Sequence, residues 1–297
     1  MSDETATMSA PARLLPQRRE VAVLGGTTAY WVDEPQTDSA EDAPTLVTVH
    51  GFRGEHHGLA PVIARLPGYR VISPDLPGFG ETPPVPGRTH DLELYVEWLQ
   101  EFVATVCPGA VVVGHSFGSI VSAAAVAAGL ETPRLVLINP IGAPALEGPR
   151  GIMTRLAIFY YWAGARLPQA LGEALLRNRV IVRVMSITMA KTREPELRRF
   201  VHEQHDLYFS QFADRDVLHD AFVTSVSHDV SEFAPQVAVP TLLIAAQLDD
   251  ITPIEKEREL VHLFPDARLV EIPDVGHLIH YETPVPAAEA ITAFVGA

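Results

Sequence analysis

The sequence contains a single cysteine, Cys107, so it can form no internal disulfide bond. That scarcity excludes the small secreted scaffolds that disulfides hold together. Cys107 ends a segment of helical periodicity, just before Pro108, and we interpret it as a packing residue. Stability must therefore come from a hydrophobic core. Apolar residues make up 47% of the 297 positions, which is enough for one large domain.

Lysine is scarce too, since Lys191 and Lys256 are the only two, and 22 basic residues stand against 37 acidic ones. The net charge of −15 disfavours nucleic acid and anionic membrane surfaces as partners. Long apolar runs are missing, which argues against stable membrane insertion. Residues 1–18 are polar and lack the apolar segment of a signal peptide, so we expect a disordered lead on a cytoplasmic protein.

Short runs rich in Val, Ile and Leu alternate with segments of helical periodicity along most of the chain. This alternation predicts an α/β fold in which a mostly parallel sheet is covered by helices on both faces. The expected strands are residues 45–52, 69–80, 110–113, 134–140, 239–250 and 267–277, after a hairpin at 21–32. The expected helices include residues 91–106, 253–264 and 284–295.

The alternation stops after Pro140. Residues 141–233 open with a Gly/Pro-rich linker and continue with helical periodicity and few strand signals. We therefore predict one core domain, residues 19–140 and 234–297, which is interrupted by a helical insertion at 141–233.

The sequence GHSFG at residues 114–118 matches the G-x-S-x-G pattern of a nucleophile elbow. It follows a β-branched run and opens a small-residue apolar stretch, which is the strand–turn–helix context that the motif needs. The glycines allow the tight turn, and the hydroxyl of Ser116 would project from the edge of the sheet. A serine nucleophile also needs a base and an orienting acid. Asp249 and His277 follow in that order, each after a late strand.

On these residues the chain resembles the α/β-hydrolase superfamily, in its lid-bearing serine hydrolase branch. The motifs that carry the resemblance are HGF at 50–52, DLPGFG at 75–80, the elbow, the acid loop around Asp249 and the Gly-His pair at 276–277. The resemblance extends from about Val21 to the end of the chain. It implies the α/β-hydrolase fold, with the insertion at 141–233 as a helical cap.

The resemblance also implies a role for each site residue. Ser116 would be the nucleophile and His277 the base. The backbone N–H groups of Phe52 and Phe117 would form the oxyanion hole, so neither side chain would take part in the donation.

Asp249 and Asp250 are alternatives for the acid. In similar proteins the acid lies four residues before a proline and about three after a small residue, and Asp249 fits both because of Pro253 and Ala246. Ala246 stands where the family usually has glycine. We predict Asp249 as the acid and Asp250 as a solvated or loop-capping residue.

Other histidines receive structural interpretations. His280 follows His277 by three residues but lacks the preceding glycine, and His115 should point away from the serine hydroxyl. His50 is expected to hydrogen-bond within its loop. The segment HEQH at 202–205 is one residue short of a zinc helix, so we predict no metal there.

The aromatic cluster FYYW at 159–162 lies in the insertion. It could line a pocket, form the core of the insertion or touch a membrane. The acidity of the chain argues against the membrane, and we predict that Tyr160, Tyr161 and Trp162 line a substrate pocket.

The sequence therefore predicts a carboxylesterase-like serine hydrolase that forms an acyl-enzyme and cleaves an ester or related acyl bond of a small, largely apolar molecule. It predicts no cofactor and no metal. Two alternatives stay open. The same triad serves C–C bond hydrolases, cofactor-free oxygenases, lyases and perhydrolases, and a ligand-binding protein without catalysis could retain it.

Overall fold

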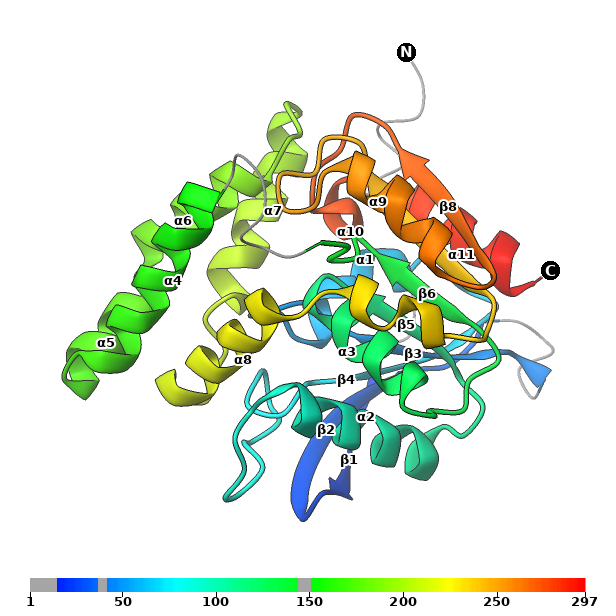
Figure 1. Cartoon of the computed structure of the whole chain (residues 1–297), viewed down its shortest axis with the longest axis horizontal. Helices are drawn as coiled ribbons and strands as arrows, with labels where there is room; N and C mark the ends of the chain where they lie inside the picture. The colour runs from blue at the N-terminus through cyan, green and yellow to red at the C-terminus, as the bar shows by residue number, and fades with distance from the viewer. Residues whose placement is uncertain (1–14, 37–41, 144–150, 297) are drawn as a thin grey trace.

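The computed structural model describes residues 15–36, 42–143 and 151–296 (Figure 1). The strands are β1 (Gln17–Val23), β2 (Gly26–Asp33), β3 (Thr45–Val49), β4 (Arg70–Pro74), β5 (Val111–His115), β6 (Leu135–Ile138), β7 (Thr241–Ala246) and β8 (Ala267–Ile272). The helices are α1 (Ala60–Ile63), α2 (Leu92–Val106), α3 (Phe117–Ala127), α4 (Gly151–Arg166), α5 (Gln169–Leu176), α6 (Arg179–Met189), α7 (Pro195–Tyr208), α8 (Arg215–Ser227), α9 (Ile254–Leu260), α10 (Ile279–Glu282) and α11 (Pro284–Val295). Short 3-10 helices are η3 (His56–Leu59), η4 (Val230–Glu232), η5 (Ala234–Gln236) and η6 (Val261–Leu263).

The strands form one eight-stranded sheet in the order β1-β2-β4-β3-β5-β6-β7-β8. β2 pairs antiparallel with both of its neighbours, β1 and β4. All the other neighbouring strands run parallel, from β4 through β3, β5, β6 and β7 to β8. The prediction of a mostly parallel sheet after an N-terminal hairpin is confirmed.

The side chains of the central strands alternate between two hydrophobic cores. In β5, Val112 packs into one core while its neighbours Val111 and Val113 pack into the other. Because successive side chains of a strand point to opposite faces, each face of the sheet receives its own core. Helices α2, α3, α4, α5, α8 and α9 contribute to the first core, and α1, α10 and α11 contribute to the second. The continuous apolar runs in the sequence therefore reflect burial on both faces.

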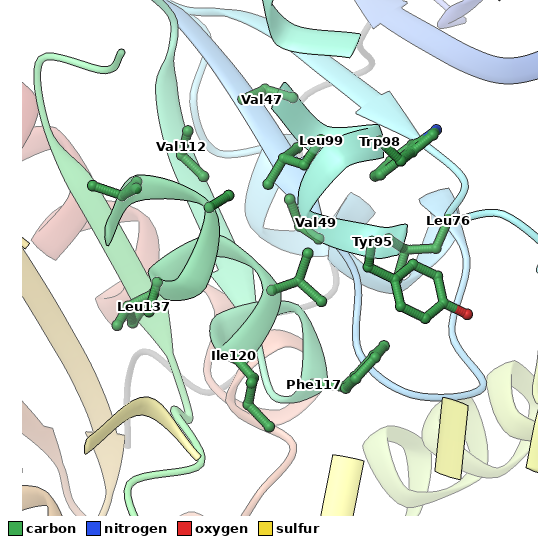
Figure 2. Close-up of a cluster of buried hydrophobic side chains, with 14 of the residues drawn as sticks. Val47, Val49, Leu76, Tyr95, Trp98, Leu99, Val112, Phe117, Ile120 and Leu137 are labelled. Atoms are coloured by element: carbon green, nitrogen blue, oxygen red, sulfur yellow. The ribbon is translucent and has the colours of Figure 1, made fainter. Parts of the chain in front are cut away.

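Helix α2 shows how local sequence sets an element of the first core. The side chain of Asp91 accepts a hydrogen bond from the backbone N–H of Leu94 at 3.0 Å, so Asp91 caps the helix and the first helical residue is Leu92. Tyr95, Trp98 and Leu99 then repeat at helical spacing and are fully buried. Figure 2 shows these three side chains packed with Phe117 and Ile120 of α3 and with Val47, Val49, Val112 and Leu137 of the strands.

Helices α4–α8, named here the insertion helices, fill the interval between β6 and β7 and lie together on one side of the sheet (Figure 1). α4 packs against α5 and α8, and α6 packs against α7. Asn178, Glu194 and Asp214 cap α6, α7 and α8 with their side chains. Within the described ranges, no helix is long and apolar enough to cross a membrane.

The structure corrects two predicted boundaries. β1 begins at Gln17, inside the expected disordered lead of residues 1–18, and residues 1–14 lie outside the described part of the chain. The predicted hairpin at 21–32 omitted the first four residues of β1 because they are exposed and polar and show no apolar alternation, although the whole strand pairs with β2. The helix expected at 253–264 ends as α9 at Leu260 and continues only as the short helix η6.

Candidate active site

Ser116 lies where β5 ends and α3 begins. Its backbone has φ of 52° and ψ of −118°, a conformation that costs a non-glycine residue about 1–3 kcal/mol. A Cβ atom on Gly118 would lie 2.1 Å from the carbonyl oxygen of Val49, and one on Gly114 would lie 2.5 Å from that of Gly118. Only glycine at these two positions lets the strand and the helix approach closely enough to form this turn.

His277 connects Ser116 to Asp249 through two hydrogen bonds. Its Nε2 lies 2.7 Å from Ser116 Oγ, and its Nδ1 lies 2.8 Å from Asp249 Oδ2. Since a carboxylate can only accept, Nδ1 carries the proton of the second bond, and Nε2 is left to accept the serine proton. Asp249 follows β7 and His277 follows β8, so both residues reach Ser116 from the carboxyl ends of parallel strands.

Asp249 is held as a carboxylate inside the protein. Burial alone would raise the pKa of Asp249, but His277 and the backbone N–H groups of Ile251 and Thr252 outweigh burial and lower it. The side-chain amide of Asn139 also donates to Oδ2, at 3.0 Å. Asn139 follows β6 with φ of 44°, and its role was not predicted from the sequence. Its one local signal was an Asn-Pro pair at the end of a predicted strand.

Asp250, the alternative acid, faces a different partner. Its carboxylate forms an ion pair with the Nζ atom of Lys191, in the segment between α6 and α7. Both residues line a hollow of about 320 Å³ that also includes Asp249. The geometry therefore assigns Asp249 to His277 and assigns Asp250 to a contact with the insertion.

The loop after β3 lies against the elbow. A Cβ atom on Gly51 would lie 3.0 Å from the His115 ring and 3.2 Å from the Cβ of Ser116, so the backbone passes directly beside the serine. The backbone N–H groups of Phe52 and Phe117 donate to no acceptor among the described residues. Two donors near the serine hydroxyl are what an oxyanion hole requires, and α3 adds the positive end of its dipole.

The remaining histidines near the site are packed or bonded, as predicted. His50 accepts the backbone N–H of Leu76 at Nε2 and contacts the carbonyl of Gly51 at Nδ1, so it braces the loop. Burial lowers the pKa of His115 to about 3, and its Nε2 has no partner among the described residues. His280 is buried in α10 and stacks edge-on against His115, with ring centroids 4.2 Å apart.

Arg53 is a functional candidate that the sequence analysis missed. Its side chain is almost fully buried, at 1% exposure, and its backbone φ is 60°. The guanidinium donates to the carbonyls of Leu176 and Phe209, both at 2.8 Å, and to the hydroxyl of Tyr161 at 3.3 Å. Leu176 ends α5 and Phe209 caps α7, so two helix C-termini compensate the charge in place of a carboxylate. Arg53, which directly follows Phe52, thereby connects the core to the insertion helices.

Tyr160, Tyr161 and Trp162, which were predicted to line a pocket, lie in three different environments. Tyr161 is buried and its ring packs against Phe52, with centroids 5.4 Å apart. The Tyr160 hydroxyl donates to carbonyls at the end of α5, including that of Leu176 at 3.2 Å. Trp162 is 48% exposed and stacks on Phe159, which is 61% exposed. Of the three, the structure places Tyr161 beside the elbow, while Trp162 faces solvent.

The HEQH segment of α7 is bound within the insertion. His202 Nδ1 and His205 Nδ1 both contact the hydroxyl of Ser186, at 2.6 and 2.7 Å. Ser186 on α6 is fully buried, so the two histidines satisfy its hydroxyl and join α6 to α7. These contacts give the pair a structural role that needs no metal.

The fold and this arrangement define the class of the protein before any relative is considered. A mostly parallel sheet carries a serine at a strand–helix elbow, with an acid and a histidine after the last strands. The alpha/beta hydrolase family matches the chain over residues 46–290. The chain therefore belongs to the alpha/beta hydrolase family and is a hydrolase of that family.

Curated proteins and a solved structure resemble the chain over most of its length. The uncharacterized hydrolase YugF of Bacillus subtilis is 27% identical over 266 residues, covering 84% of this chain and 89% of YugF. Lipase 1 of Psychrobacter immobilis is 24% identical over 261 residues, covering 84% of this chain and 76% of the lipase. A thermophilic esterase from Thermogutta terrifontis has a TM-score of 0.71 at 22% identity, covering 94% of this chain and 98% of the esterase, and it shares the fold.

Proposed function

We propose that the chain is a serine hydrolase that cleaves an ester or a related acyl bond of a small, largely apolar molecule. The observation that carries this proposal is the continuous hydrogen-bonded path from Ser116 Oγ through His277 to Asp249, with bonds of 2.7 and 2.8 Å. The strained φ of 52° at Ser116 supports it, because such strain persists mainly at functional positions. The relationship to Lipase 1 at 24% identity supports an ester as the substrate.

In the first half of the reaction, Ser116 Oγ attacks the carbonyl carbon while His277 Nε2 takes the hydroxyl proton. The π electrons of the carbonyl move onto its oxygen and form a tetrahedral intermediate. When this intermediate collapses, the bond to the leaving oxygen breaks, and that oxygen takes the proton from His277. The alcohol departs and the acyl group remains on Ser116.

In the second half, a water molecule attacks the acyl carbon while His277 accepts one of its protons. The second tetrahedral intermediate releases the carboxylic acid as Ser116 Oγ takes the proton back from His277. Asp249 keeps Nδ1 protonated throughout and stabilises the imidazolium in both halves. Asn139 positions Asp249 through its bond to Oδ2.

The developing negative charge on the carbonyl oxygen would be held by the backbone N–H groups of Phe52 and Phe117. The insertion helices would form a cap over this point, with Tyr161 near the acyl group because its ring packs on Phe52. Aromatic rings from both sides support a largely apolar substrate with few polar contacts. The proposal keeps the cytoplasmic location that the sequence predicts and needs no cofactor.

A fluorophosphonate probe tests the proposal directly, because it labels only a serine whose proton is removed by a neighbouring base. We expect the wild type to be labelled and Ser116→Ala to be unlabelled, with the loss of at least about 10³-fold in kcat that triad removal causes. Ser122→Ala is the matched control, since Ser122 is a buried serine of the same helix whose hydroxyl has no partner among the described residues.

A series of p-nitrophenyl esters of increasing acyl length then measures how much apolar substrate the site accepts. Turnover should rise with acyl length and then fall when the chain exceeds the space beneath the insertion helices. Absence of labelling would contradict the activated serine. Labelling without turnover of any ester, together with cleavage of a C–C bond in a dienone substrate, would contradict the ester as the substrate.

A further inference from the structure

Glu55, His56 and His57 lie in the loop after Phe52. They meet a second carboxylate, Asp75, which follows β4. Glu55 directs one carboxylate oxygen to each imidazole: Oε1 lies 2.7 Å from His57 Nδ1, and Oε2 lies 3.3 Å from His56 Nδ1. Asp75 adds its Oδ1 atom at 2.9 Å from His56 Nδ1. The ligand atoms of Glu55, His56 and His57 all lie within 4.8 Å of one another. Glu55, His56 and His57 therefore converge on one small volume, and Asp75 contacts it through His56.

Glu55 and Asp75 accept hydrogen bonds from backbone N–H groups and contact the two imidazoles, which are cations only when protonated. Glu55 is 4% exposed and Asp75 is completely buried. Among the described residues, no lysine or arginine forms an ion pair with either carboxylate. Buried charges are normally paired or bound to metals, because removing a carboxylate from water is costly. A divalent cation would balance both carboxylates at once.

The side chains are also held in place before any ligand arrives. The His56 ring stacks on Trp31 with centroids 3.2 Å apart, and the His57 ring stacks on Tyr208 of α7 at 4.3 Å. The second oxygen of Asp75 accepts the backbone N–H of Glu81 at 2.7 Å. In metal sites, contacts of this kind hold the ligand side chains in the orientation that binds the ion, which reduces the entropy lost on binding.

We propose that Glu55, His56 and His57 form a binding site for a divalent transition metal ion of the zinc type, with the carboxylate of Asp75 beside it. Two imidazole nitrogens and one carboxylate oxygen are a ligand set that Zn²⁺ accepts, and a water molecule would complete the four-coordinate geometry. Each imidazole would bind the metal through Nδ1 and keep its proton on Nε2. The inference does not depend on the proposed hydrolysis, because none of these residues contacts the path from Ser116 to Asp249.

The bound ion would strengthen the connection between the core and the insertion helices. Glu55, His56 and His57 follow the core strand β3, whereas Tyr208, on which His57 stacks, belongs to α7. Fixing His57 therefore fixes the position at which α7 meets the loop after Phe52. We expect Zn²⁺ to raise the melting temperature of the full-length protein because it binds the folded state and not the unfolded one.

The test is a calorimetric titration of Zn²⁺ into full-length protein that has been treated with EDTA and dialysed. We expect one ion per chain in the wild type. Glu55→Gln and His57→Phe should each weaken binding at least tenfold, and the phenylalanine keeps a ring to stack on Tyr208. The matched control is His228→Phe, because His228 forms an exposed pair with Glu232 of the same chemistry, at 2.9 Å. It should bind like the wild type.

Replacing Zn²⁺ with Co²⁺ adds a spectroscopic readout, since four-coordinate Co²⁺ with nitrogen ligands absorbs strongly in the visible range. That absorption should be absent in His57→Phe, which is only half-buried and should fold even if the buried Glu55→Gln does not. Failure of the wild type to bind Zn²⁺ would overturn the proposal. So would binding that survives in His57→Phe but is lost in His202→Phe, because it would place the ion at the HEQH segment.

Discussion

The sheet core and the insertion helices are stabilised in different ways. All but one of the residues of α3 are buried, as is every residue of β5, β6 and β7. In α6, by contrast, only Val182 and Ser186 are buried. Large apolar side chains of the insertion helices remain exposed, among them Leu156, Phe159, Trp162, Leu171, Val180, Val184 and Ile187. These core strands are therefore buried at every position, whereas the insertion helices bury one face, partly in the same hydrophobic cluster through Tyr161, Leu218 and Phe222, and expose the other.

Polar contacts also connect the insertion to core residues near the site. Arg53 reaches the ends of α5 and α7, and Asp250 pairs with Lys191. Glu282 of α10 accepts the backbone N–H groups of Lys191 at 2.8 Å and Thr192 at 3.1 Å. Each of these core residues lies within five positions of a candidate site residue, so the same loops carry the site and its contacts with the insertion.

The largest expected loss of stability comes from a substitution in the densely packed core, at the elbow that holds Ser116. Gly118→Ala would bring a methyl group within 2.1 Å of the Val49 carbonyl, and neither backbone segment can move without disturbing the sheet. We expect the free energy of unfolding to fall by at least about 3 kcal/mol and labelling by a fluorophosphonate to be lost. Urea denaturation measures the first effect. Gly68→Ala is the matched control, because no atom lies within 4 Å of its added carbon.

The second prediction concerns the hydrogen bonds that join the core to the insertion helices. Arg53→Met keeps an unbranched apolar stem but removes the guanidinium and its three donated hydrogen bonds. We expect about 2–3 kcal/mol of destabilisation, because the carbonyls of Leu176 and Phe209 are left without their partner. Since Arg53 follows Phe52, kcat for a short ester should also fall, by about tenfold, with little change in KM.

The control for this variant is Arg88→Met, which removes an exposed ion pair with Glu97 and should change stability by less than about 1 kcal/mol. If Arg53→Met retains the wild-type kcat, the position of the Phe52 N–H group does not depend on contacts with the insertion helices.

A third prediction concerns the pH dependence of the core beside Asp249. Burial raises the pKa of Glu257 in α9 well above 4.5, and the charge of Asp249 raises it further. The folded state therefore keeps a proton that the unfolded chain releases above pH 4.5. Stability should fall as pH rises from 4.5 towards the raised pKa, with a slope of up to about 1.4 kcal/mol per pH unit.

Glu257→Gln should remove this decline, so its advantage over the wild type should grow between pH 5 and pH 9 in urea denaturation. Glu255→Gln, an exposed position on the same helix, serves as the control and should follow the wild-type curve. A wild-type stability that stays level across this range would contradict the assignment of a buried neutral carboxyl group.

The smallest effects compare two neighbouring aromatics of α4. Tyr161→Phe removes the hydroxyl that Arg53 contacts at 3.3 Å and should cost about 1 kcal/mol. Trp162→Phe changes a half-exposed ring and should cost less than about 0.5 kcal/mol. Ester kinetics on the pair also test the pocket prediction, since KM should change for Tyr161→Phe and stay constant for Trp162→Phe.

Local sequence was sufficient for the parts of the molecule that local physics determines. β-branched runs predicted the parallel strands because burial on both faces demands apolar residues at every position. The elbow and the chain order of Ser116, Asp249 and His277 predicted which side chains come together, and the structure brings these three into contact. Their catalytic roles remain predictions that the labelling experiment addresses.

The features that were missed depend on contacts between distant positions. Arg53 forms hydrogen bonds with residues 108, 123 and 156 positions away, so no local sequence pattern could predict that it is buried. Asp75 lies 19 residues from His56, and its DLPGFG segment was interpreted as the end of a strand and as a motif of the family resemblance, with no contact to His56 predicted. The insertion was predicted as helical but its buried and exposed faces were not, because its exposed apolar residues blur the helical pattern.

Cys107 makes the chain convenient for attaching a probe at one chosen position. The native thiol is buried, and burial raises its pKa to about 12, so almost none of it is thiolate at neutral pH. A cysteine introduced at Val180, which is 71% exposed on α6, would be the one rapidly alkylated thiol in the chain. A fluorescent dye at that position would report whether the insertion helices move during turnover, with the native Cys107 left in place.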